Sequence, residues 1–283
     1  MSKELPMKAP GTGTGKIYLP REHGATAMLF TPMACVAILA RTWHWVELAT
    51  AVAAFAAMSV KDPVVLLLRE RFVWKRAHAD GPAARKWATI WSVLLVASGI
   101  VLLMTWPLVA VVAMAGSLGA FSGLAVWVNV KNKQRSTLFQ ILSAAALTSS
   151  SLAMSLSAKG AIADWCWWLW GLLGAQAATG ILVVHARLDA KIALKGKVAD
   201  DGKFRRAAMV AIAVLVCGAF YMLFSAHRPW LAVALMFAAL VYSNDLRAQL
   251  NPENLEMPLM RVGRRALAMS SLYAVLLIVG LWG

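Results

Sequence analysis

The chain has 283 residues, of which 60% are apolar, a mean hydropathy of +0.67 and a formal net charge of +15. This composition is typical of a membrane protein with one helical domain, and it excludes a separate soluble domain of any size. The positive charge lies in short loops between apolar segments. We therefore attribute it to membrane topology and to attraction to anionic headgroups, and we expect no nucleic-acid binding.

Nine apolar segments follow one another, each close to the roughly 20 residues with which an α-helix crosses a bilayer. We therefore expect an all-α, polytopic membrane protein with nine transmembrane helices. Residues 1–20 are expected to form a flexible cytoplasmic tail, and residues 21–283 a single transmembrane domain. The segments lie at about 24–40, 45–68, 87–104, 107–128, 137–157, 165–186, 207–226, 229–243 and 264–282.

The basic residues occupy alternate gaps between these segments. If the N-terminus is cytoplasmic, the inside gaps hold 24 of the 28 Lys and Arg residues, whereas the outside gaps hold Arg41, Lys159 and Arg228, and Lys61 lies within a segment. Cytoplasmic loops carry the excess of Lys and Arg in membrane proteins, so the pattern predicts an N-in, C-out topology. A group of tryptophans falls at the outer end, where indoles anchor in headgroups or, alternatively, stack on a ligand.

Segment 45–68 contains Lys61-Asp62-Pro63, the sharpest polar site of the chain. Ionisable groups at membrane depth cost free energy unless they are paired or hydrated, so each requires a reason. Pro63 lacks a backbone donor and predicts a kink near Ser59, beside Asp62. Two interpretations stay open: the pair contributes to a site, or it only holds this helix in place.

Further polar residues lie at the cytoplasmic ends of other segments. His185 and Asp189 are four residues apart and share a helix face, although one His and one carboxylate are few ligands for a metal. We predict that several helix ends line one cytoplasm-facing cavity, formed by Arg21, His23, Asp62, Asn129, His185, Asp189 and Asp245. The outer half, by contrast, has few ionisable groups, which disfavours an ion-coupled transporter.

The stretch Pro20-Arg21-Glu22-His23-Gly24-Ala25-Thr26-Ala27-Met28 resembles the opening signature of the YwiC-like family of bacterial integral membrane proteins. The family usually has an aromatic residue where this chain has Thr26. The likeness extends to the basic residues after segment 45–68 and to the loop that ends with Pro258–Gly263. It implies a multi-pass protein of the bacterial cytoplasmic (inner) membrane.

A more distant likeness is to the UbiA-type intramembrane prenyltransferases. Their Asp-rich motifs, NDxxDxxxD and DxxxD, hold Mg²⁺ on the diphosphate of a polyprenyl donor. Aligned with this chain, the first motif has Lys61 in place of its Asn, keeps Asp62 as its first Asp, and has Val65 and Arg69 in place of the other two. The second motif has His185 in place of its first Asp and keeps Asp189 as its second. Two of five carboxylates remain, a poor set for Mg²⁺, which demands near-octahedral oxygen ligation. Metal dependence therefore stays open.

The resemblance implies a UbiA-like bundle whose cavity binds an amphipathic ligand such as a prenyl lipid or a quinone. If the chain is an enzyme, Asp62 and Asp189 are the catalytic candidates. The ligand-binding candidates are Arg21, His23, Lys61, Arg69, Asn129, His185, Arg187 and Asp245. The cations among these candidates could also grip a phosphate or carboxylate directly. The alternatives are an active prenyltransferase with a reduced metal site and a non-catalytic assembly or transport protein.

Overall fold

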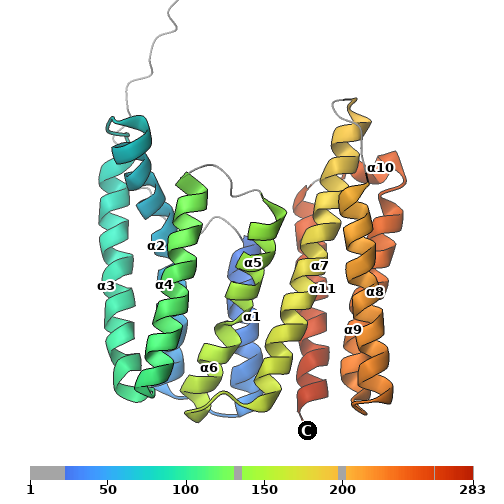
Figure 1. Cartoon of the computed structure of the whole chain (residues 1–283), viewed down its shortest axis with the longest axis horizontal. Helices are drawn as coiled ribbons and strands as arrows, with labels where there is room; N and C mark the ends of the chain where they lie inside the picture. The colour runs from blue at the N-terminus through green and yellow to red at the C-terminus, as the bar shows by residue number, and fades with distance from the viewer. Residues whose placement is uncertain (1–22, 131–135, 197–201, 258, 283) are drawn as a thin grey trace, which may run out of the picture.

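The computed structural model describes residues 23–130, 136–196, 202–257 and 259–282, and these residues form helices with no strand among them. Figure 1 shows the long helices standing side by side, with neighbouring stretches of the chain running in opposite directions and α5 and α6 together forming one stretch. The elements are α1 (His23–Ala40), α2 (Trp45–Leu68), the π-helix η1 (Arg69–Trp74), α3 (Gly81–Thr105), α4 (Leu108–Val130), α5 (Thr137–Thr148), α6 (Ser150–Lys159), α7 (Asp164–Leu194), α8 (Lys203–Phe224), α9 (Pro229–Ala248), α10 (Pro252–Leu255) and α11 (Leu259–Leu281).

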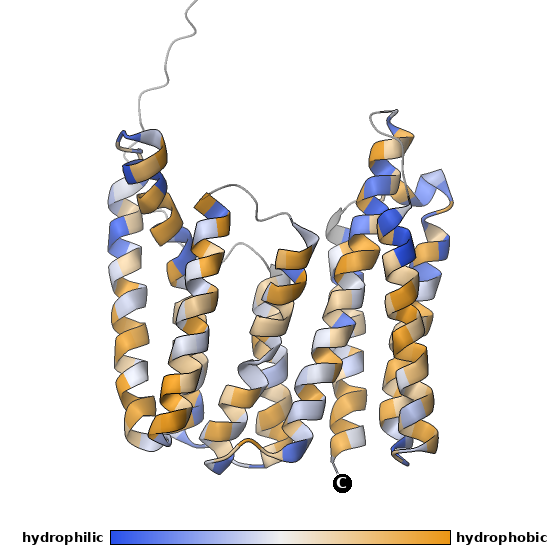
Figure 2. Cartoon of the chain, in the orientation of Figure 1, coloured by the Kyte–Doolittle hydropathy of each residue, from blue (hydrophilic) through white to orange (hydrophobic). Residues whose placement is uncertain are grey.

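Eight helical stretches of the described chain are long and apolar enough to span a membrane, and α1 is a shorter apolar helix of the same kind. The predicted all-α membrane architecture is thereby confirmed, whereas the count of nine crossings and the N-in orientation stay predictions. Apolar residues dominate the middle of the helices and polar residues gather toward their ends (Figure 2). Helices α3, α7, α8 and α9 extend several residues beyond the predicted segments, because their polar last or first turns continue the helix.

The two ends of the bundle differ in charge. We call the end at which α2, α4, α7 and α9 finish the basic end, and the opposite end, where α7 and α9 begin, the tryptophan end. Of the described Lys and Arg residues, those at the tryptophan end are Arg41, Lys159 and Arg228. The tryptophan end carries Trp43, Trp45, Trp106, Trp165, Trp167, Trp168, Trp170, Trp230 and Trp282.

The largest core lies between α1, α6, α7, α8, α9 and α11. Its centre is polar as well as apolar: the Gln176 amide donates to the Tyr242 hydroxyl (2.8 Å) and to Ser270 (3.1 Å), and Tyr242 donates back to the Gln176 carbonyl (3.0 Å). Such bonds join α7, α9 and α11 where no water competes. A smaller core of Leu102, Trp106 and Leu156 connects α3 and α6 with residues of α2 and α4.

Helices α5 and α6 form one candidate membrane span, interrupted at Ser149 within a Ser-rich stretch. The Ser149 hydroxyl donates to the Ala146 carbonyl, and Ser150 donates to the Leu29 carbonyl of α1 (2.7 Å). Ser151 and Ser155 are fully buried. Small hydroxyl side chains thus let α6 approach the backbone of α1.

Helix α2 continues without a break from Trp45 to Leu68, so Pro63 does not interrupt it. The irregularity lies six residues after Pro63, where the π-helix η1 begins at Arg69 and is closed by Lys75 in the left-handed conformation (φ 50°). Glu70 fastens this turn to α3, because its carboxylate accepts a 2.6 Å hydrogen bond from the His78 amide and packs against Gly81. The chain therefore reverses tightly between α2 and α3.

Candidate functional site

Four of the predicted site residues lie on α2, η1 and α4 as two separate pairs, which we together call the α2 cluster: Lys61 with Asp62, and Arg69 with Asn129. The Lys61 ammonium lies 3.8 Å from an Asp62 carboxylate oxygen, and their side chains are 29% and 44% exposed. Arg69 donates to the backbone carbonyl of Asn129, whose amide donates to the Ala125 carbonyl (2.8 Å). Arg69 therefore ties the end of α2 to α4.

The Lys61–Asp62 pair lies about seven residues, or roughly 10 Å, inside the last residue of α2. This depth falls within the stretch of α2 that is apolar enough to span a membrane. Because the two residues are adjacent on a helix, their side chains diverge, and a 3.8 Å separation is at the outer limit of an ion pair. The pair is thus partly exposed and loosely joined at a depth where charge is costly.

A second group lies at the basic end on α7, α9, α10 and α11, which we call the α7 cluster: His185, Arg187, Asp189, Asp245, Asn254 and Arg265. Asp245, Arg187 and His185 each contact a residue on another helix. Arg265 lies 2.9 Å from Asp245, and Arg187 donates to the Asn254 carbonyl at 2.5 Å. These contacts hold α10 and α11 against α7 and α9.

His185 has partners on two further helices. One ring nitrogen shares a 3.0 Å hydrogen bond with the Gln140 side chain of α5, and the ring packs on Phe204 of α8 at 5.0 Å between centroids. Asp189, one turn on, interacts electrostatically with this imidazole, as the shared helix face predicts. His185 therefore joins three helices at the position that the UbiA-type motif gives to a carboxylate.

The two clusters are built from different helices and lie in different parts of the bundle in Figure 1. Arg21 lies outside the described residues, and so does the side chain of His23, whose backbone begins α1. Asp62 lies on α2 and Asn129 on α4, whereas His185 and Asp189 lie on α7 and Asp245 on α9. Whether these predicted residues bind a ligand stays a prediction.

A shallow cavity of about 650 Å³ does lie at the basic end, directly after the α2 cluster. It is formed by η1, the following turn and the start of α3. Four exposed cations face it, with Glu70 at its wall: Arg71, Lys75, Arg76 and Arg85. None of them was among the predicted site residues, although the run of basic residues after segment 45–68 was visible in the sequence.

In the described part of the chain, no three His, Cys, Asp or Glu side chains come close enough together to hold a metal ion. The three cysteines are free thiols, with Cys35 and Cys166 buried and Cys217 exposed.

Taken together, the spans and the two polar clusters define a multi-pass helical membrane protein whose polar groups are concentrated at one end. Residues 19–155 match the family of YwiC-like proteins, a region that runs from the Pro20–Met28 signature to α6. No curated protein and no solved structure matches the chain. The matched region contains the whole α2 cluster.

Proposed function

We propose that the chain is a YwiC-like protein of the bacterial cytoplasmic membrane over its full length, and that it binds an amphipathic lipid with an anionic or polar head beside α2. The observation that carries the proposal is the Lys61–Asp62 pair. Both side chains are partly exposed at membrane depth, and they lie 3.8 Å apart. A ligand head that pairs with them would lower the cost of keeping these charges in the bilayer.

The surroundings of the pair fit such a ligand. Arg69 lies about 12 Å further along the axis of α2, and the cationic cavity after η1 follows it. Guanidinium groups bind phosphate and carboxylate through paired hydrogen bonds, so this path offers successive sites for an anionic head. The ligand tail would then lie against the apolar, lipid-exposed surface of α3 and α4, where Val96, Val109 and Val112 are exposed.

The α7 cluster supports the proposal by contrast. Asp245, Arg187 and His185 make close contacts with Arg265, Asn254 and Gln140, which accounts for them as helix-joining residues. We therefore propose Lys61 and Asp62 as the main residues that bind the ligand head. Asp189 and the other predicted residues are the second choice. The ligand class that we favour is a prenyl lipid, with a quinone as the second choice.

An enzymatic version of the same site is a UbiA-type prenyltransferase with a reduced metal site. In that version Asp62 and Asp189 hold a metal ion or stabilise an allylic cation, while Lys61 and Arg69 bind the diphosphate. A non-catalytic assembly or transport protein would bind the lipid without Mg²⁺. Metal dependence of binding therefore separates the two.

The test measures the thermal stability of the purified chain with farnesyl diphosphate, geranylgeranyl diphosphate or a quinone, each with and without Mg²⁺. We expect a diphosphate to raise the melting temperature of the wild type and to have little effect on Asp62→Asn and Lys61→Gln. Glu253→Gln removes a carboxylate at the same end, outside the α2 cluster, and should respond like the wild type. A response that is the same in all four proteins would contradict binding at α2.

A further inference from the structure

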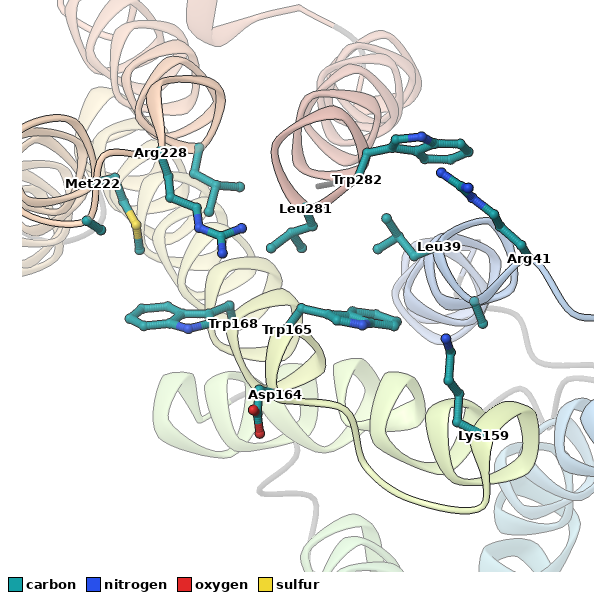
Figure 3. Close-up of a pocket in the computed structure, with 13 residues that line it drawn as sticks. Leu39, Arg41, Lys159, Asp164, Trp165, Trp168, Met222, Arg228, Leu281 and Trp282 are labelled. Carbon is teal, nitrogen blue, oxygen red and sulfur yellow. The ribbon is translucent and has the colours of Figure 1, made fainter.

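A second cavity, of about 520 Å³, lies at the opposite end of the molecule. It opens between the ends of α1, α8 and α11, the loop after α6 and the starts of α7 and α9 (Figure 3). Buried apolar residues form its inner wall, among them Met222, Leu231 and Leu281. Its volume is within the range of sites that bind small molecules or lipid headgroups.

Three cations line this cavity: Arg41, Lys159 and Arg228. They are the described Lys and Arg residues of the whole tryptophan end: Arg41 follows α1, Lys159 is the last residue of α6, and Arg228 precedes α9. Topology alone predicts few cations here and gives no reason for them to meet. Their convergence on one cavity therefore calls for a cause other than topology.

The lining has an excess of positive charge. Its acidic residue is Asp164, whose carboxylate points away from the cations in Figure 3. The ion pairs of Lys61 with Asp62 and of Arg265 with Asp245 lie elsewhere, and no ion pair among the described residues involves Arg41, Lys159 or Arg228. Figure 3 shows Arg228 and Lys159 reaching toward the cavity from opposite sides. An anion that entered would meet uncompensated positive charge.

The backbone holds two of the cations in fixed positions. Arg41 closes α1 in the left-handed conformation (φ 56°), which non-glycine residues seldom adopt, and its guanidinium stacks over Trp282 at 4.4 Å. His227 has the same conformation (φ 52°) directly before Arg228, whose amide donates to the Met222 carbonyl at 2.7 Å. Unusual backbone of this kind often marks a functional site.

Trp165 and Trp168, in the first turns of α7, complete the lining of the cavity (Figure 3). Indole side chains prefer the headgroup level of a membrane, where one edge meets apolar chains and the N–H meets polar groups. The cavity thus combines cations and indoles at the height where lipid phosphates lie.

We propose that this cavity binds a phosphate group, that of an anionic phospholipid headgroup, between Arg41, Lys159 and Arg228. Guanidinium and ammonium groups donate charge-assisted hydrogen bonds to phosphate oxygens, and Trp165 and Trp168 contact the glycerol region. The site lies at the other end of the molecule from the α2 cluster and is independent of the function proposed above. Free phosphate presents the same chemistry, so the experiment must separate the two sources.

The test measures how fast an amine-reactive reagent labels Lys159, relative to Lys195 at the basic end, with mass spectrometry of the peptides. The full chain is placed in nanodiscs of phosphatidylcholine, in phosphatidylcholine discs with added inorganic phosphate, and in discs with increasing phosphatidylglycerol. We expect phosphatidylglycerol to protect Lys159 selectively. Protection by inorganic phosphate as well would show that the phosphate group is sufficient; its absence would show that the lipid is required.

Arg228→Gln tests the assignment, because only its side chain, and not its backbone bond to Met222, changes. We expect the phosphatidylglycerol fraction at half-protection to rise about fivefold, the effect of losing one cation near an anionic headgroup. Arg206→Gln, an exposed cation at the basic end, should leave that fraction unchanged. Equal labelling of Lys159 in every disc, or an unchanged fraction in Arg228→Gln, would overturn the proposal.

Discussion

Gly280 of α11 is the position at which one added methyl group has the clearest consequence. A Cβ placed there would lie 2.5 Å from Leu231 Cδ2, 2.9 Å from Cγ and 3.0 Å from the Leu231 backbone nitrogen. Leu231 is 1% exposed and packed in the main core, so its side chain has no free volume to enter. The backbones of α9 and α11 would have to separate.

We expect Gly280→Ala to destabilise the protein. Overpacking costs about 1–3 kcal/mol, and the better helix propensity of alanine returns about 0.5–1 kcal/mol, so the net loss is about 0.5–2 kcal/mol. This corresponds to a fall in melting temperature of roughly 1–8 °C, measured by thermal unfolding in detergent. Leu231 and Leu281 also line the cavity at the tryptophan end, so the same change should weaken the protection of Lys159 by phosphatidylglycerol.

Gly116→Ala is the matched control, because Gly116 also lies inside a helix but has no atom within 4 Å of an added Cβ. It should melt at the wild-type temperature or slightly above it. In a Leu231→Ala background the cost of Gly280→Ala should shrink, since the side chain that it meets is gone. If Gly280→Ala melts no lower than Gly116→Ala, the close approach of α9 and α11 is wrong.

Three further predictions test other parts of the structure. Tyr242→Phe removes the hydroxyl that bonds Gln176 and should lower stability by about 0.6 kcal/mol, the average for a hydrogen bond between membrane helices, in a denaturation series. Asp245→Asn should cost less than about 1 kcal/mol, because Arg265 is 55% exposed, and a larger loss in the same assay would contradict that estimate. Reporter fusions inserted at Gly160 should be active outside the cytoplasm; cytoplasmic activity there would reverse the predicted topology.

Much of the architecture follows from local sequence. The apolar segments predict the helices to within a few residues at most ends, because the length of an apolar run and the cost of bare backbone in lipid act on each segment separately. The concentration of Lys and Arg at one end of the bundle is also predicted by the sequence, since it depends only on the positions of these residues between the apolar segments. The π-helix after Leu68 was missed, because its ending depends on Glu70 reaching His78 and Gly81 across the turn.

The sequence by itself also identified Lys61 and Asp62 as residues that need an explanation, because charge inside an apolar run is costly wherever the helix packs. Only the tertiary structure decided which polar residues meet. It pairs Asp245 with Arg265 and His185 with Gln140, and it gathers Arg41, Lys159 and Arg228 from three separate parts of the chain around one cavity. Hydropathy and charge determine where each helix begins and ends and in which direction it is expected to cross the membrane. Which helices are neighbours depends on side-chain packing between segments far apart in the chain.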